Sequence, residues 1–263
     1  MGVLNITPDS FSDGGELLHL RGPDLGAVVA RAEAMIAAGA DILDIGGESS
    51  RPGAAPVPLD EELRRVMPVL ERLAELDTMI SVDTYKPEMA EQALRGGCHL
   101  INDIGGGRDP HMLQVIAQST GAYCLMHMQG SPRDMQQDPV YQDVVQEVRD
   151  FLEAQVARAV SLGITSERLL IDPGFGFGKT LEHNLRLLSR LDALRALGIP
   201  ILVGMSRKRM LGALTGKPVG QRLAAGVAAA SVALLQGAAI VRSHDVAATA
   251  DAVAVIGALQ VPL

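Results

Sequence analysis

The sequence predicts an α/β fold, namely a (β/α)8 or TIM barrel, formed by a single domain over residues 1–263. Short apolar runs alternate along the chain with segments whose apolar residues have helical spacing. Such alternation implies parallel strands joined by helical crossovers, in either a closed barrel or an open doubly wound sheet. The number of strand and helix units is eight, which favours the barrel.

A third observation concerns the ends of the apolar runs. Four runs stop at a carboxylate or amide, and Gly, Pro or Thr follows within two residues. This pattern is typical of buried parallel strands that open into loops at one rim of a sheet. In a barrel of this kind the functional site lies at that rim. The polar residues in question are Asp44, Asp83, Asn102 with Asp103, and Asp172.

The expected strands are residues 2–6, 42–45, 79–83, 100–102, 122–127, 169–172, 200–205 and 239–242. The expected helices are residues 25–38, 61–76, 87–95, 111–119, 141–162, 182–197, 221–235 and 246–259, with a further short helix from Ser206. Local signals support several bounds. Gly39 ends the first helix, Asp60 precedes the second, and Pro87 occupies a tolerated early position in the third.

The composition narrows the class of function. Hydrophobic residues make up 48% of the chain and aromatic residues only 3%, so the core is expected to consist of Ala, Val, Leu and Ile. The net charge of −8 argues against a general nucleic-acid binder or a protein of anionic membrane surfaces, which would need a basic face. Cys98 and Cys124 lack a CxxC or His-rich pattern, so they are expected to be buried thiols.

The sequence shows no signal that would target the protein to another compartment or to a membrane. Met1 is followed at once by Gly-Val-Leu-Asn, without the basic segment and long apolar stretch of a signal peptide. The apolar stretch at residues 224–235 is shorter than the roughly 20 residues that a membrane span needs. We therefore expect a cytoplasmic protein that does not enter the membrane.

One rim of the barrel is expected to carry acids, amides and cations together. The other strand ends add Asn5, His127, Ser206, Lys208, Arg242 and His244 to the four runs described above. The alternative is that each carboxylate only caps the following helix, and for Asp44 both interpretations remain open. For the set as a whole a functional site is the better interpretation.

Several longer motifs, taken in order, resemble the dihydropteroate synthase family of folate biosynthesis. They are MGVLNITPDSFSDGG from Met1, GGESSRPG from Gly46, SVDT from Ser81, NDI from Asn102, MHMQG from Met126, DPGFGFGK from Asp172, GMSRK from Gly204 and RSHD from Arg242. The resemblance covers essentially the whole chain. It implies a transferase that joins (7,8-dihydropterin-6-yl)methyl diphosphate to 4-aminobenzoate, giving 7,8-dihydropteroate and diphosphate.

The resemblance also implies roles for the rim residues in binding a pterin. A pterin edge offers parallel N–H donors, and a carboxylate can accept such a pair in bidentate form. Asp172 takes this role by resemblance, while Asp83 and Asn102 bond other ring positions and Lys208 donates to ring acceptors. The implied pterin-binding residues are Asp83, Asn102, Ile104, Met126, Asp172, Phe177, Gly204 and Lys208.

For the diphosphate the resemblance implies Asn5, Arg51, Arg242 and His244, with Mg²⁺ as cofactor and Asn5 as its protein ligand. One amide oxygen together with diphosphate oxygens and waters suits Mg²⁺, which rarely uses a cage made only of protein groups. The alternative for Arg242 is a salt bridge with Asp245.

The aminobenzoate site is implied to lie on two loops, residues 7–15 and 48–54, and at the amino end of the helix expected from Ser206. The contributing residues are Phe11, Ser50, Arg51, Pro52, Lys208 and Arg209. Ser50 stands where Thr is common in the family, and Arg209 stands where a small Ser is frequent.

An aniline nitrogen is a weak nucleophile, so departure of the diphosphate is expected to come first, in a dissociative substitution. The implied catalytic residues are Asp13, Asp83, Asn102 and Lys208. The family further implies a homodimer with small-molecule substrates. Two alternatives remain, namely a pterin-binding methyltransferase and a non-catalytic paralogue that binds pterin. A nucleotide-binding loop is excluded, because Pro173 stands where the first Gly of a P-loop would be.

Overall fold

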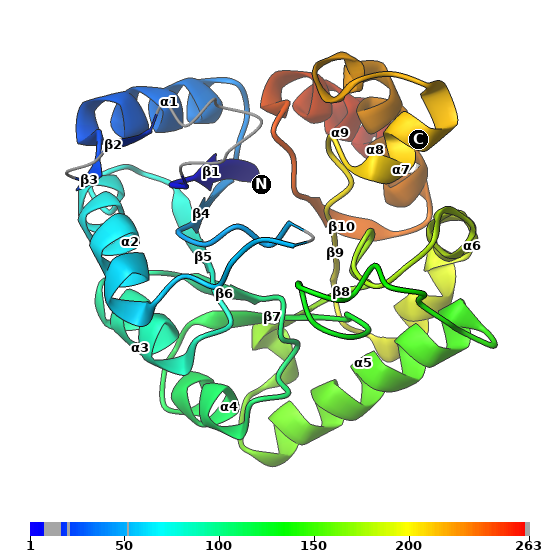
Figure 1. Cartoon of the computed structure of the whole chain (residues 1–263), viewed down its shortest axis with the longest axis horizontal. Helices are drawn as coiled ribbons and strands as arrows, with labels where there is room; N and C mark the ends of the chain where they lie inside the picture. The colour runs from blue at the N-terminus through cyan, green and yellow to red at the C-terminus, as the bar shows by residue number, and fades with distance from the viewer. Residues whose placement is uncertain (8–16, 20–21, 52, 261–263) are drawn as a thin grey trace.

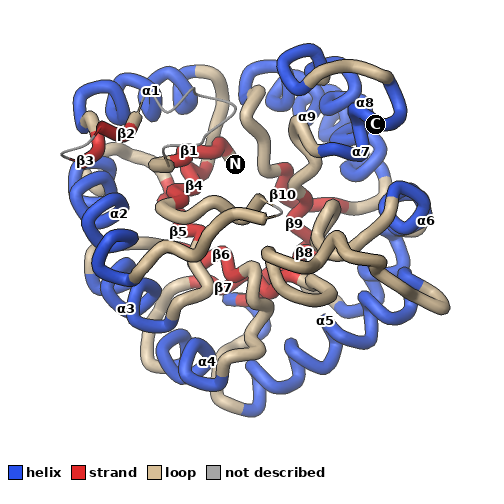
Figure 2. The backbone as a smooth tube through the Cα atoms, in the orientation of Figure 1, coloured by secondary structure: helices blue, strands red, loops and turns tan. Residues whose placement is uncertain are grey.

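A computed structural model describes all residues of the chain except 8–16, 20–21, 52 and 261–263. Its main sheet has eight parallel strands whose order in space follows their order in the sequence. Figures 1 and 2 show the strands at the centre and the helices around them. The strands are β1 (Gly2–Asn5), β4 (Ile42–Gly46), β5 (Met79–Asp83), β6 (Leu100–Asp103), β7 (Ala122–Met126), β8 (Leu169–Asp172), β9 (Ile201–Val203) and β10 (Ala238–Val241).

The first and last strands of the sheet meet and close the barrel. Gly2 and Ser243 form a parallel bridge, and the backbone N–H of Val3 donates to the carbonyl oxygen of Ser243 at 3.2 Å. The amino group of Met1 donates to the carbonyl oxygen of Val241 at 3.0 Å. The predicted (β/α)8 barrel is therefore confirmed, with every rim residue on the same side of the molecule.

The helices that surround the barrel are α1 (Leu25–Ala37), α2 (Leu59–Leu73), α3 (Pro87–Arg95), α4 (Pro110–Ala117), α5 (Val144–Ser161), α6 (Leu181–Ser189), α7 (Arg209–Thr215), α8 (Leu223–Leu235) and α9 (Val246–Gln260). Side-chain caps fix several of their starts. Asp143, for example, accepts hydrogen bonds from the backbone N–H groups of Val145 and Gln146, so α5 begins after it.

Three local features differ from the prediction. A short hairpin of β2 (Leu18–His19) and β3 (Gly22–Pro23) precedes α1. The helix expected at residues 182–197 continues after α6 as a 3-10 helix (Leu191–Leu197), whose three-residue period buries both Leu191 and Leu194. The expectation of a helix start at Ser206 was also wrong, because Arg207 has a φ of 59° and α7 begins only at Arg209.

The core lies both inside the barrel and between the strands and the helices. Leu100, Cys124 and Leu202 are buried together as one cluster, which Leu170 and Ile240 contact. Cys98 and Cys124 are both buried and unpaired, as the sequence predicted. In the described part of the chain, no helix is both long and apolar enough to span a bilayer.

Candidate active site at the carboxyl ends of the strands

A cavity of about 590 Å³ opens at the predicted rim. The predicted site residues that line it are Asn5, Ser50, Arg51, Asp83, Phe177, Lys208, Arg209, Arg242 and His244. Other predicted residues do not line the cavity but are buried, namely Asn102, Ile104, Met126, Asp172 and Gly204. Phe11, Asp13 and Pro52 lie outside the described residues.

Asp44 is the centre of a buried cluster on β4 and its neighbours. Its Oδ1 accepts a hydrogen bond from Ser81 Oγ at 2.5 Å, and its Oδ2 accepts from Arg242 Nε at 2.5 Å and from Asn102 Nδ2 at 3.4 Å. The strand register explains the first contact, since Asp44 and Ser81 are paired across β4 and β5. Asp44 therefore orients Asn102 and Arg242 from below and is itself fully buried.

Arg242 connects Asp44 to Asp83, whose Oδ2 accepts from the guanidinium at 2.9 Å. Burial raises the pKa of Asp83 to about 7, against the opposing effect of Arg242, and Asp44 raises it further. Burial lowers the pKa of Arg242, but Asp44 and Asp83 together hold this pKa above its ordinary value. The alternative partner considered for Arg242 was wrong, since Asp245 pairs with Arg207 instead.

Asp172 and Lys208 lie at the ends of β8 and β9. Asp172 Oδ1 accepts from the backbone N–H of Gly174 at 2.7 Å, and Lys208 Nζ donates to the carbonyl oxygen of Phe175 at 2.5 Å. Burial raises the pKa of Asp172 and lowers that of Lys208 to about 8, while each opposes the shift of the other. No ion pair within 4 Å joins these two described side chains.

An apolar slot lies next to these polar groups. Ile104, Met126 and Phe177 pack in one small cluster that is separate from the main core. Lys208 Nζ lies 4.6 Å from the centre of the Phe177 ring. Within the described structure, Asn102 Oδ1 is buried without a hydrogen-bond partner. A buried acceptor without a partner can receive an N–H donor of a bound ligand.

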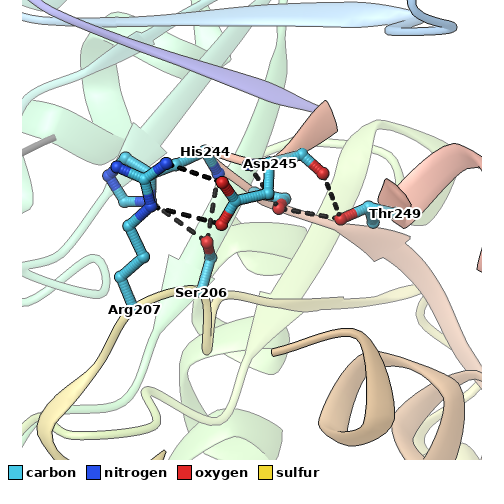
Figure 3. A network of polar contacts seen from close by, with 6 residues as sticks. Ser206, Arg207, His244, Asp245 and Thr249 are labelled. Atoms are coloured by element: carbon cyan, nitrogen blue, oxygen red, sulfur yellow. Dashed lines mark hydrogen bonds and ion pairs between the residues drawn. The ribbon is translucent and has the colours of Figure 1, made fainter. Parts of the chain in front are cut away.

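His244 belongs to a polar network that joins the loops after β9 and β10 (Figure 3). Its backbone N–H donates to Ser206 Oγ at 3.2 Å, and Arg207 forms a bidentate pair with Asp245 at 2.6 and 3.2 Å. Burial, with Arg242 and Arg207 nearby, lowers the pKa of His244 to about 3. His244 is therefore neutral at pH 7, and it offers the cavity a hydrogen-bonding group rather than a charge.

The sequence was compared with known proteins. Residues 1–244 match the model of the family described as pterin binding enzyme. The dihydropteroate synthase of Escherichia coli (strain K12) is 49% identical over 259 residues, which cover 98% of this chain and 90% of that protein. The chain belongs to the dihydropteroate synthase family of pterin-binding enzymes.

Two crystal structures of the dihydropteroate synthase family agree with the fold at 49% identity. The Burkholderia cenocepacia enzyme complexed with 7,8-dihydropteroate has a TM-score of 0.87, with coverage of 99% of this chain and 90% of that one. The Xanthomonas albilineans enzyme with 4-aminobenzoic acid has a TM-score of 0.90, with coverage of 100% and 93%. The resemblance inferred from the motifs is thus confirmed.

The motifs had implied Mg²⁺ with Asn5 as its protein ligand. In the described ranges, no group of three His, Cys, Asp or Glu residues is arranged to hold a metal ion. Asn5 lies at the carboxyl end of β1 and lines the cavity, so its side-chain amide could supply one oxygen there. This donor set fits Mg²⁺ held mainly by the oxygens of a diphosphate and by water.

His127 is another rim residue, and its contacts are structural. Lys179 Nζ lies 2.9 Å from His127 Nδ1 and donates to the carbonyl oxygens of Gly174 and Phe177, both at 3.0 Å. Burial and the neighbouring Lys179 lower the pKa of His127 to about 2, so its ring is neutral. The interpretation of His127 as a hydrogen-bonded rim residue agrees with these contacts.

Some residues of the site were missed by sequence reasoning. The role of Asp44 was left open, and Ser81 was not singled out. A signal did exist, because Ser81 precedes Asp83 by two residues and so points to the same face of the strand. Arg207 and Asp245 gave no comparable signal, since their contact joins two loops 38 residues apart.

Proposed function

We propose that the protein catalyses the dihydropteroate synthase reaction, the condensation of (7,8-dihydropterin-6-yl)methyl diphosphate with 4-aminobenzoate. The observation that carries this proposal is the buried, unpartnered Asn102 Oδ1 at the end of β6, at the same rim as the apolar cluster of Ile104, Met126 and Phe177 and as Arg242. A flat heterocycle and an anionic group could thus be held side by side. The ligands of the two related crystal structures, 7,8-dihydropteroate and 4-aminobenzoic acid, support the same substrates.

The pterin ring is proposed to bind at the buried polar groups. Asp172 would accept the paired N–H donors of the ring, and Asn102 and Asp83 would bond its other edge. Lys208 would donate to ring acceptors, and its ammonium lies over Phe177, one of the residues proposed to line the pterin. Ile104, Met126 and Phe177 would line the faces of the ring, with Gly204 beside Arg242 and Lys208.

The diphosphate is proposed to lie against Arg51, Arg242 and His244, all of which line the cavity. The two arginines supply charge, and the neutral His244 supplies a hydrogen bond. Asn5 would contact Mg²⁺, which when bound would neutralise charge on the diphosphate oxygens. Arg242 would give up part of its contact with Asp83 as it turns to the diphosphate.

The reaction is proposed to be dissociative. The bond between the pterin methylene carbon and the diphosphate oxygen breaks, both electrons leave with the diphosphate, and the dihydropterin carries the positive charge. The lone pair of the aniline nitrogen then forms the bond to the methylene carbon, and the nitrogen releases its extra proton to water. Asp13 is proposed to stabilise the cationic intermediate, with Asp83, Asn102 and Lys208 holding the ring in place.

The second substrate is proposed to enter the same cavity. Ser50, Arg51, Lys208 and Arg209 line the cavity and would contact 4-aminobenzoate, together with Phe11 and Pro52. Arg209 adds a cation near the substrate carboxylate. The Ser50 hydroxyl keeps the hydrogen-bonding group that Thr has in many relatives.

We also propose that two copies pair through α8 and α9, and that the enzyme acts in the cytoplasm. α8 carries no charged residue and α9 carries only Asp251, yet Val232, Leu235, Val253 and Val255 are exposed on them. An apolar, nearly uncharged face suits a symmetric interface, in which each patch meets its own copy. Sedimentation equilibrium of wild type and Val255→Asp would test the pairing, which the charge should weaken.

The activity is tested with purified protein, both substrates and Mg²⁺. Formation of 7,8-dihydropteroate together with diphosphate in equal amounts is expected. A non-catalytic paralogue would bind the pterin diphosphate in a calorimeter and release no diphosphate. A pterin-binding methyltransferase would not consume 4-aminobenzoate. Either of these results would reject the proposal.

A further inference from the structure

A buried ionic cluster lies beneath the loop after β4, outside the groups assigned above. Lys86 Nζ forms ion pairs with Glu48 Oε2 and Glu62 Oε2, and the Tyr85 hydroxyl donates to Glu48 Oε1 at 2.7 Å. These four residues, here called the latch, come from three places: the loop after β4, the loop after β5, and α2. Glu48 begins the loop 48–54 that the motifs implied for the aminobenzoate site, but no role of its own was assigned to it or to the other three.

The burial of the latch indicates that it is more than a surface ion pair. The side chain of Glu62 is 1% exposed, that of Glu48 12% and that of Lys86 16%. Within the described structure, Glu62 Oε1 is buried without a hydrogen-bond partner, so Lys86 is the group that compensates this carboxylate. Two carboxylates share one ammonium, and burial of such charge is costly unless it is paired.

The position of Glu62 supports the same conclusion. α2 buries a stripe of Val66, Val69 and Leu73, and Glu62 lies on this stripe one turn before Val66. An acid on the buried face of a helix needs a partner from the structure packed against it. The loop after β4 supplies Glu48 at this place, and Lys86 joins the two carboxylates.

Next to the latch, the loop after β4 also approaches α2 closely. The guanidinium of Arg65 donates to the carbonyl oxygen of Gly47 at 2.9 Å. A Cβ on Gly47 would lie 2.6 Å from Val66 Cγ2, so the backbone of the loop is in direct contact with the helix. Glu48 follows directly, and Ser49, Ser50 and Arg51 then line the cavity.

We propose that the latch of Glu48, Glu62, Tyr85 and Lys86 is a positioning device that holds Ser50 and Arg51 where the second substrate binds. It acts through the loop and touches no reacting atom. The identity of that substrate as 4-aminobenzoate rests on the proposed function, whereas the fastening of the loop does not. The hydrogen bonds described for Asp172, Asn102 and Lys208 do not involve the latch. The Tyr85 ring packs against the cluster of Ile104, Met126 and Phe177, so a variant that keeps this ring should leave pterin binding intact.

The test compares Lys86→Met with Lys86→Arg and with Arg95→Met. The first variant removes the ammonium, and the second keeps the charge. Arg95→Met is the matched control, since Arg95 forms an exposed pair with Glu91 at the other end of α3. Three quantities are measured: hydrogen exchange of peptides covering residues 46–51 without ligand, the KM for 4-aminobenzoate, and the Kd of a pterin without diphosphate.

For Lys86→Met we expect at least tenfold faster exchange in residues 46–51, a tenfold or larger rise in the aminobenzoate KM, and a pterin Kd within twofold of wild type. Lys86→Arg should recover a large part of both changes, and Arg95→Met should change none. Unchanged exchange and unchanged KM would overturn the proposal. Equal losses in pterin binding and aminobenzoate use would also overturn it, because they would indicate general destabilisation.

A second variant and a fallback measurement cover the cases in which the first experiment fails. If Lys86→Met does not fold, Tyr85→Phe removes a single hydrogen bond to Glu48, and we expect changes of about threefold in the same directions. If the wild-type protein forms no dihydropteroate, the proposed function has failed, and hydrogen exchange alone decides whether the latch fastens the loop.

Discussion

Two corners of the barrel mouth use acids and cations differently. In the paired corner, Arg242 forms ion pairs with Asp44 and Asp83 at 2.5 and 2.9 Å. In the open corner, Asp172 and Lys208 bond backbone groups of the loop after β8 and make no ion pair with one another. Both corners are largely buried, so the difference lies in how the charges are satisfied.

The difference indicates what each corner can accept. Charges in the open corner have oxygens and protons left for a ligand, so a neutral heterocycle with donors and acceptors can bind there without breaking an ion pair. The paired corner is already neutralised in part, and an anion must draw Arg242 away from a carboxylate. We therefore expect variants of the open corner to change binding, and variants of the paired corner to change stability as well.

The largest expected effect is that of Asp172→Ala on pterin binding. Each hydrogen bond to a charged group contributes about 1.5–3 kcal/mol, so loss of a bidentate pair should weaken binding by more than about 100-fold. Calorimetry with the pterin diphosphate measures the affinity. Circular dichroism should show an unchanged fold, and a Kd equal to that of wild type would refute the assignment of Asp172.

The paired corner is tested by Asp44→Asn. Asp44 is fully buried and accepts from Ser81, Asn102 and Arg242, so its loss leaves these donors without a charged acceptor. Removal of one partner of a buried ion pair costs about 3–5 kcal/mol, and the remaining pair with Asp83 should reduce this to about 3 kcal/mol. Urea denaturation measures the loss.

Ser81→Ala is the matched control for Asp44→Asn, because it removes only one hydrogen bond to the same carboxylate. It should lower the unfolding free energy by about 1 kcal/mol. A larger loss for Ser81→Ala than for Asp44→Asn would contradict the view that Asp44 is the centre of the paired corner.

The pH dependence of stability should reveal the paired corner. Burial raises the pKa of Asp83 from 3.8 to about 7, so between these values the folded chain holds a proton that the unfolded chain has released. The contribution of Asp83 to the unfolding free energy therefore falls as the pH rises from about 4 to about 7. Asp83→Asn should lack this component in denaturation curves, and an identical pH profile for both proteins would argue against it.

The pH dependence of pterin binding should reveal the titration of Lys208 in the open corner. Burial lowers the pKa of Lys208 from 10.5 to about 8, so the ammonium loses its proton as the pH rises through 8. Pterin affinity should then decline above pH 8, by about tenfold, because a neutral amine is a weaker donor than an ammonium. Calorimetry between pH 6 and 10 measures the decline. Lys208→Met should bind weakly with no such decline, and a flat wild-type profile would exclude Lys208 as a charged donor.

Much of both corners was predictable from sequence, for a physical reason. Asp83, Asn102 and Asp172 end apolar runs, and parallel strands in a barrel bring such ends to one rim. The pairing of Arg242 with Asp44 was not predictable, because it depends on barrel closure between residues 198 positions apart. From the sequence, the salt bridge considered as an alternative for Arg242 was with Asp245, its near neighbour in the chain.

The latch shows a second limit of structure prediction from sequence. Glu62 stands on the apolar stripe of α2, and a charge at such a position indicates a buried partner without naming it. Lys86 and Glu48 belong to loops, and their meeting follows from the packing of both loops on α2. Periodicity identifies which face of a helix is buried, but it does not identify what covers that face.

The smallest expected effect concerns the pair of Arg207 and Asp245, in which Arg207 directly precedes Lys208 in the chain. Its side chains are 23% and 22% exposed, so Arg207→Ala should lower the unfolding free energy by only about 1 kcal/mol, far less than Asp44→Asn. Arg207 also has a left-handed backbone, with a φ of 59°. Arg207→Gly relieves that strain, which is about 1 kcal/mol, and should therefore be nearly neutral in thermal denaturation. Equal losses for the Ala and Gly variants would mean that the ion pair, rather than the backbone, determines the cost of this turn beside Lys208.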